Sequence, residues 1–169
     1  MPNLTLNDFL LLPNKSISKD VIEEGFDRLY MRKGFKYLSN YNDGYVYEGF
    51  CITVATVEVG LDKQRTGLFK NLIHKIRKNL PDTPIVVENV QTDYLIRHLH
   101  NNGWVDVFSG YPSRPPSFID NIKLLEITDK VTDLDKIEIK SESHKAMIEL
   151  CKSDMEELQE YYKKIGIKN

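Results

Sequence analysis

The segment VEVGLDKQRTGLFKNLIHKI, residues 57–76, constrains the fold more than any other part of the chain. It begins as a strand-like run, continues through a polar loop and ends in an amphipathic sequence. A helix is predicted from Thr66 or Gly67 to about Leu80, because apolar residues recur there at helical spacing. A strand that leads through a short loop into a helix is typical of α/β proteins, in which helices pack on a sheet.

The junction has the composition of an anion site. The first N–H groups of a helix have no acceptor within the helix, and the helix dipole favours negative charge beside them. Gly67 tolerates a positive φ and allows a phosphate to approach the backbone closely. Gln64, Arg65 and Thr66 add side-chain donors. No Lys-Ser or Lys-Thr pair follows the glycine, so the segment is not a P-loop, and it lacks the three glycines of a dinucleotide motif.

The flanking sequence predicts alternating helices and strands. We expect a helix over residues 18–34, a hairpin over residues 35–59 that turns at 42–44, and a buried strand at residues 84–90. A helix capped by Thr92 follows and ends near Gly103, and two further strands flank a proline-rich loop. Residues 141–169 predict a long amphipathic helix whose seam packs on its own domain or on a partner chain. These patterns divide the chain into a domain at 1–140 and a C-terminal helix at 141–169.

Composition narrows the class of protein. The chain has 169 residues, of which 41% are hydrophobic and 28% charged, which is typical of a globular protein. A formal net charge of −2 makes nucleic acid an unlikely partner. Cys51 and Cys151 form no disulfide framework and no metal-binding spacing, and Cys51 is expected as a buried strand residue. No apolar run reaches the roughly 20 residues that span a bilayer, so we expect no membrane partner. The cysteine usage favours a reducing compartment and offers no metal-ligand spacing, so we expect a cytoplasmic protein with no bound metal.

The junction resembles the central motif of the GNAT acyltransferases (Gcn5-related N-acetyltransferases). In that family a bulged strand leads into Gln/Arg-x-x-Gly-x-Gly/Ala and then a helix, and here Gln64, Gly67 and the helix start at Leu68 match. The resemblance continues through IVVENVQTDYLIRHLHNNGW, with Gly103-Trp104 at the family's usual Gly-Phe or Gly-Trp. It covers Val54 to about Ile119 and is closest to GNAT-like proteins of bacteriophages, which would place the protein in the host cytoplasm. The implied fold is a mixed, mostly antiparallel sheet flanked by helices.

The resemblance implies acetyl-coenzyme A as cosubstrate. The backbone of Val57 and Val59 would pair with the pantetheine arm, and Asn89 would mark the point where the next strand splays away. Two positions depart from the family pattern: Phe69 replaces a glycine or alanine, and Leu99 replaces a tyrosine acid. The pyrophosphate would lie on the backbone amides of the junction, namely Gln64, Arg65, Thr66, Gly67, Leu68 and Phe69.

Three residues are candidates for the chemistry of acetyl transfer. Deprotonation of the amine needs a base, and the thiolate leaving group needs a proton. Glu58 on the motif strand and Glu88 at the end of the next strand are candidate bases, each with the alternative of a surface charge or an ion pair. Tyr94 is a candidate acid, with helix packing as its alternative. His98 and His100 lie on different faces of the predicted helix and form no metal pair.

The leading hypothesis is an acetyl-coenzyme A-dependent N-acetyltransferase that transfers the acetyl group directly to an unknown amine, in a small molecule or a protein. One alternative is a GNAT-like phage protein with weak or no catalysis that acts by binding a host protein. The other is an acyltransferase directed at nucleotides or nucleic acids. The sequence leaves open whether the chain is a monomer or a homodimer.

Overall fold

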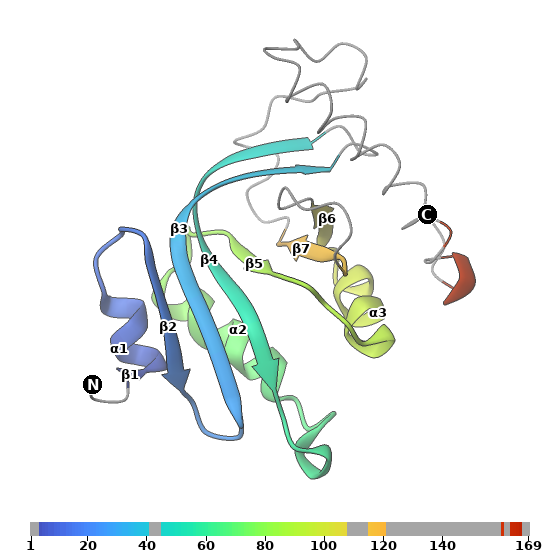
Figure 1. Ribbon diagram of the computed structural model, residues 1–169, viewed down its shortest axis with the longest axis horizontal. Helices are drawn as coiled ribbons and strands as arrows, with labels where there is room; N and C mark the ends of the chain where they lie inside the picture. The colour runs from blue at the N-terminus through green and yellow to red at the C-terminus, as the bar shows by residue number, and fades with distance from the viewer. Residues whose placement is uncertain (1–3, 41–44, 108–114, 121–159, 161–162, 167–169) are drawn as a thin grey trace. The chain divides into compact units, whose positions relative to one another are not determined.

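A computed structural model of the 169-residue chain describes residues 4–40, 45–107, 115–120, 160 and 163–166 (Figure 1). The chain divides into two compact units, one of residues 1–35 and 49–88 and the other of residues 36–48 and 89–169. The described residues form three α-helices, one short 3₁₀ helix and seven strands, in both parallel and antiparallel pairs. The predicted α/β class with a mixed sheet is therefore confirmed.

The strands that lie wholly or mostly in the first unit follow one another in the sheet in chain order. They are β1 (Leu4–Thr5), β2 (Ile17–Ile22), β3 (Arg28–Asn40), β4 (Tyr45–Glu58) and β5 (Ile85–Val87). β1 runs parallel to β2, β2 antiparallel to β3, and β4 parallel to β5. The neighbouring strands β3 and β4 confirm the predicted hairpin, whose turn lies outside the described residues.

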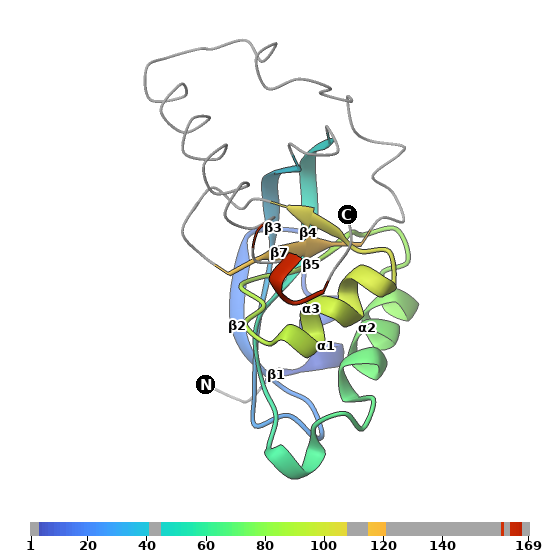
Figure 2. The same cartoon turned by 90° about the vertical axis from the view of Figure 1, so that its right-hand side faces the viewer.

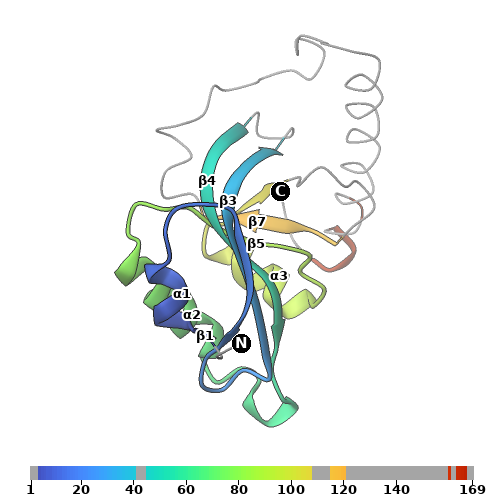
Figure 3. The same cartoon turned by 60° about the vertical axis from the view of Figure 1, so that its left-hand side comes forward.

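The helices of the first unit, α1 (Leu6–Leu11) and α2 (Leu68–Asn79), lie on the same side of β2, β3 and β4 (Figures 2 and 3). α1 begins with a capping box: the Asp8 N–H donates to Thr5 Oγ1 at 3.2 Å, and the Thr5 N–H donates to Asp8 Oδ2 at 3.3 Å. These two hydrogen bonds satisfy donors that a helix of only six residues cannot satisfy internally. Sequence analysis did not identify this helix.

The predicted helix over residues 18–34 is wrong. This segment forms β2, a turn and the first part of β3, with Asp20 opposite Tyr30 and Ser18 opposite Arg32 in antiparallel register. Gly25 turns the chain with φ of 91°. A left-handed residue stops a right-handed helix, and strand pairing satisfies the backbone on either side of the turn.

A buried lysine connects β3 to α1. Lys33 is 2% exposed, and its ammonium donates to the carbonyls of Leu10 and Leu12, both at 2.8 Å. Its Nζ also lies 5.5 Å from the centre of the Phe9 ring. Because the last carbonyls of a helix have no donor within the helix, Lys33 satisfies the end of α1. It occupies a core position in the alternation that begins with Leu29 and Met31, both buried.

The second unit contains α3 (Asp93–Asn101), β6 (Val105–Val107) and β7 (Ser117–Ile119). Thr92 caps α3 as predicted, with its Oγ1 accepting from the Leu95 N–H at 3.4 Å. β6 and β7 pair antiparallel, so a strand lies within each of the two predicted segments. The predicted helix at 141–169 and its apolar seam lie almost entirely outside the described residues.

Replacing Lys33 with methionine should destabilise the first unit. Methionine keeps the length of the side chain but leaves the carbonyls of Leu10 and Leu12 without this donor. We expect the free energy of unfolding, measured with urea, to fall by about 1–3 kcal/mol. The exposed Lys78→Met variant should change it by less than about 0.5 kcal/mol. Equal stability of the Lys33→Met variant and the parent would contradict this role.

The pH dependence gives an independent check on Lys33. Burial lowers the pKa of its ammonium from the ordinary 10.5. As the pH rises toward 10.5, the unfolded chain therefore holds more protons at this residue than the folded chain does. The free energy of unfolding of the parent should rise with pH in that window relative to Lys33→Met. A difference that stays constant with pH, measured by urea unfolding across the window, would contradict the shift.

Candidate functional site

The junction joins β4 to α2 through a 3₁₀ turn, η1 (Leu61–Lys63), and a short loop. Gly67 caps α2 in the left-handed conformation, with φ of 88° and ψ of 4°, and its carbonyl accepts from the Asn71 N–H at 3.0 Å. The predicted helix start is confirmed, and Gly67 adopts a positive φ, which glycine tolerates. Arg65 is also left-handed, with φ of 61°.

Two side chains of the loop donate hydrogen bonds to backbone carbonyls of the same junction. Gln64 Nε2 donates to the Val59 carbonyl at 3.3 Å, and Thr66 Oγ1 donates to the Lys63 carbonyl at 2.6 Å. These contacts differ from the expectation that both side chains would donate to an anion. They fix the shape of the loop.

The N-terminus of α2 is open for an anion. No side chain caps it, and its first turn contains no acidic residue. A Cβ built on Gly67 would meet no atom within 4 Å. The exposed N-terminal end of α2 and the helix dipole therefore favour negative charge there.

The backbone of β4 shifts its alternation between Val54 and Glu58. In a regular strand the N–H and C=O groups of successive residues point to opposite edges. The Val54 carbonyl accepts from the Glu88 N–H at 3.0 Å, on the β5 side of β4. The Glu58 carbonyl, an even number of residues later, accepts at 2.9 Å from the N–H of Asp27, which precedes β3 on the opposite side. One extra residue is needed between them, as in a β-bulge.

This irregularity, which we call the β4 bulge (residues 54–58), sets the direction of the backbone that follows. Because the Glu58 carbonyl faces β3, the alternation that places the Val54 carbonyl on the β5 side is reversed before the strand ends. Gln64 uses one lone pair of the Val59 carbonyl, and a carbonyl oxygen has two. Val57 lies inside the β4 bulge, and Val59 follows the last residue of β4.

β5 stops before β4 does. The register ends with Val54 opposite Val87, whereas β4 continues to Glu58. Asn89 then takes a left-handed conformation with φ of 51°, and its N–H donates to Ser117 Oγ at 3.2 Å. The edge of β4 after Val54 therefore extends past its pairing with β5, and Asn89 lies where the chain turns after that strand.

Glu58, the first candidate base, lies on an exposed surface. Its carboxylate is 3.6 Å from the Arg28 guanidinium, and its side chain is 57% exposed. Arg28 also binds Asp20 at 3.3 Å. The carboxylate is therefore solvated and shares an arginine, so a substrate can reach it.

Glu88, the second candidate base, is buried. Its side chain is 5% exposed and forms an ion pair with Arg32 of β3. Sequence analysis missed Arg32, because the predicted helix placed it on a solvent-facing last turn. A buried carboxylate paired with an arginine is held as an anion. Such a pairing weakens its action as a base.

The candidate acid Tyr94 lies on α3 with 54% exposure, and its ring stacks with His98 at 6.5 Å between centroids. Leu99, at the place of the family's tyrosine, is fully buried. His100 lies 3.4 Å from Asp106 and edge-on to Phe118, and burial lowers its pKa. These residues belong to the second unit.

A cavity of about 470 Å³ adjoins the junction within the first unit. No sequence pattern indicated this cavity, because one of its walls is the turn between β2 and β3, a segment that was predicted to be helical. The cavity is lined by Glu23 and Phe26 of that turn, by Lys63 and Thr66 of the loop, and by Leu68 and Leu72 of α2, among others.

Other classes of site find little support in the part of the chain that the structure describes. Within it, no group of three or more His, Cys, Asp or Glu residues could hold a metal ion. Cys51 is fully buried, as expected for a strand cysteine. No helix among the described residues has the length and apolar character needed to cross a membrane. No protein-family model, curated protein or solved structure matches the chain.

Gly25 and Gly67, the two left-handed glycines beside the cavity, should differ in how well they tolerate substitution by alanine. A Cβ on Gly25 would lie 2.6 Å from Leu68 Cδ2, whereas a Cβ on Gly67 would meet nothing. Gly67→Ala should cost about 1–2 kcal/mol of unfolding free energy from backbone strain alone. Gly25→Ala should cost about 1–3 kcal/mol more, because Leu68 must also move. Urea unfolding measures both, and equal losses would contradict the packing of the turn against α2.

Proposed function

We propose that the protein is an acetyl-coenzyme A-dependent N-acetyltransferase that transfers the acetyl group directly to an amine. The observation that carries the proposal is the β4 bulge followed by a helix whose N-terminus is open at a left-handed glycine. The bulge changes the alternation of β4 just before the junction, and α2 begins next along the chain. A ligand with an amide-containing arm and a pyrophosphate fits these two features together.

The pyrophosphate of the cosubstrate would bind at α2. The N–H groups of Leu68 and Lys70 supply donors, and Gly67 lets the phosphate approach the backbone. Gln64 and Thr66 support the site by holding the loop in shape.

The pantetheine arm would extend along β4. Its amides can pair with the backbone of Val57 and Val59, as an added strand pairs with a sheet edge. The early end of β5 and the turn at Asn89 leave this edge to the arm. The thioester would then lie near the end of β5, where an acceptor amine would meet it.

Substitutions at Gly67 test the cosubstrate site. Gly67→Asp places a carboxylate where the pyrophosphate would bind, and should weaken acetyl-coenzyme A binding at least about a hundredfold by calorimetry. Gly67→Asn has nearly the same shape and also tolerates a left-handed backbone, but carries no charge. It should bind within about fivefold of the parent.

The outcomes at Gly67 separate charge from shape. Equal losses in the two variants would point to steric exclusion or misfolding instead of an anion site. No measurable binding of acetyl-coenzyme A by the parent protein would refute the proposal. Urea unfolding of both variants serves as the control for folding.

Glu58 is the better placed of the two candidate bases, because a solvated carboxylate can receive a proton whereas Glu88 is held by Arg32. Glu58→Gln should lower turnover about a hundredfold and leave acetyl-coenzyme A affinity nearly unchanged. Turnover is measured by thiol release with amines from a panel of small molecules and peptides. Asp20→Asn is the matched control, because Asp20 shares Arg28 with Glu58. Full activity of Glu58→Gln would remove Glu58 from this role.

One observation favours a second candidate, a protein that binds coenzyme A weakly or not at all and acts by contacting another protein. The position of the family's tyrosine acid is taken by Leu99, which is fully buried and carries no proton to donate. Tyr94 would have to replace it from a different helix position. Weak or absent binding of acetyl-coenzyme A, together with no thiol release for any amine in the panel, would support this candidate over the enzyme.

A further inference from the structure

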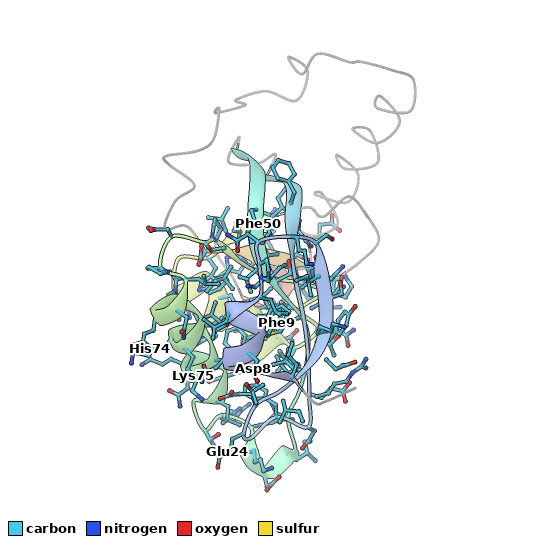
Figure 4. All side chains as sticks on the ribbon, turned by 90° about the vertical axis from the view of Figure 1, so that its left-hand side faces the viewer. Asp8, Phe9, Glu24, Phe50, His74 and Lys75 are labelled. Atoms are coloured by element: carbon cyan, nitrogen blue, oxygen red, sulfur yellow. The ribbon has the colours of Figure 1, made fainter. Side chains whose placement is uncertain are left out.

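Two arginines lie on the face of β3 that points away from the helices. Lys33 points toward α1, the helix that carries Phe9 in Figure 4. Because strand residues alternate between the two faces of a sheet, Arg28 and Arg32 both lie on the face opposite Lys33. Both α-helices of the described first unit lie on the Lys33 side (Figures 2 and 3).

Arg28 shows how an arginine on this face binds carboxylates. Its Nε lies 3.3 Å from a carboxylate oxygen of Asp20, and its Nη1 lies 3.6 Å from a carboxylate oxygen of Glu58. A guanidinium has five N–H donors, so two carboxylates can share it. At Arg28 the protein itself supplies both anions.

At Arg32 the described part of the chain supplies only one anion. Its Nη2 pairs with the carboxylate of Glu88, and its side chain is 37% exposed. Its Nε is buried and has no hydrogen-bond partner among the described residues. The guanidinium of Arg32 therefore has donors that Glu88 does not use, and solvent reaches the side chain.

The position of Arg32 brings these donors near the proposed reaction centre. Because β4 lies between β3 and β5, Arg32 and Glu88 meet across β4. Glu88 directly follows β5, and its N–H donates to the Val54 carbonyl. The proposed function places the thioester near the end of β5 and the pyrophosphate on α2. An anion on Arg32 would therefore belong to the acceptor and not to the cosubstrate.

We propose that Arg32 binds a carboxylate of the acceptor, so that the acceptor is a free amino acid, with an amine and a carboxylate in one small molecule. Arginine can hold a carboxylate through two parallel hydrogen bonds, which fix its orientation as well as its position. A carboxylate fits better than a phosphate, because Glu88 already places one negative charge beside the guanidinium. This inference rests on the proposed function, because it names the acceptor of that reaction.

Matched acceptors test the inference on the full chain. Glycine, 4-aminobutyrate and 6-aminohexanoate place the carboxylate at increasing distances from the amine, and each is compared with its amide, which lacks the charge. Thiol release is measured at matched concentrations of uncharged amine. The best of the three acids should exceed its amide at least about tenfold in kcat/KM, mainly through a lower KM.

Variants of Arg32 assign the contact. Arg32→Lys keeps a cation beside Glu88 but lacks the planar fork, and should lower the ratio of acid to amide at least about threefold. Arg32→Gln alone would leave Glu88 buried without its cation, so it is combined with Glu88→Gln. This double variant should bring the ratio to within about twofold of one.

Arg97→Gln is the matched control. Arg97 lies exposed on α3, and its loss removes the same charge. The ratio of acid to amide should stay within about twofold of the parent. Urea unfolding of every variant checks that it folds.

Calorimetry measures the carboxylate contact without turnover. The same pairs are titrated into protein saturated with coenzyme A, which has no acetyl group to transfer. The acid that is the best acceptor should bind the parent at least about tenfold more tightly than its amide. Acid and amide should bind the double variant with affinities within about twofold of each other.

The outcomes distinguish this inference from the function on which it rests. Equal kcat/KM for acids and amides, or turnover only of amines without a carboxylate, would overturn the inference and leave acetyl transfer intact. A preference for acids that survives in the double variant would overturn the assignment to Arg32. If acetyl-coenzyme A does not bind, the proposed function is refuted, and calorimetry with the ligand-free protein then supports or overturns the carboxylate site by the same ratio.

Discussion

The shifted alternation of β4 is the constraint on which the rest of the site depends. The Val54 carbonyl accepts a hydrogen bond from the residue that follows β5. The Glu58 carbonyl, an even number of residues later, accepts instead from the residue that precedes β3. This shift reverses the alternation of β4 just before the chain enters the junction loop. Without the extra residue, the Glu58 carbonyl of a regular β4 would face the β5 side and could not accept from Asp27.

Local sequence signals account for the elements that were predicted correctly. Thr92 caps α3, Gly67 begins α2, and Ile85, Val86 and Val87 form the fully buried run expected of a parallel strand. Each depends on hydrogen bonds or burial within a few residues. The helix predicted at 18–34 was wrong because the buried side of the strand found there, formed by Leu29, Met31 and Lys33, contains a lysine. A lysine counts as polar in any sequence pattern, and only its contacts with the end of α1 explain why it is buried.

The parts of the candidate site that backbone groups form could be predicted from the sequence. Gly67 and the N–H groups after it could be placed from the order of a strand, a loop and a helix along the chain. The ion pair of Glu88 with Arg32 depends on how strands distant in the chain come together, which no local pattern encodes. The cavity likewise requires the turn at Gly25 to meet Leu68. The loop side chains Gln64 and Thr66 were expected to bind a ligand, but each donates a hydrogen bond to a nearby backbone carbonyl.

Amide hydrogen exchange with and without acetyl-coenzyme A tests the central claim most directly, because it reports on individual backbone N–H groups. If the ligand pairs with the edge of β4 and its pyrophosphate lies on α2, the amides of Val57, Val59 and Leu68 to Lys70 should exchange more slowly in its presence. The amides of α1, which lies elsewhere in the same unit, should be unchanged. Slowed exchange confined to other segments, or none at saturating ligand, would contradict the claim.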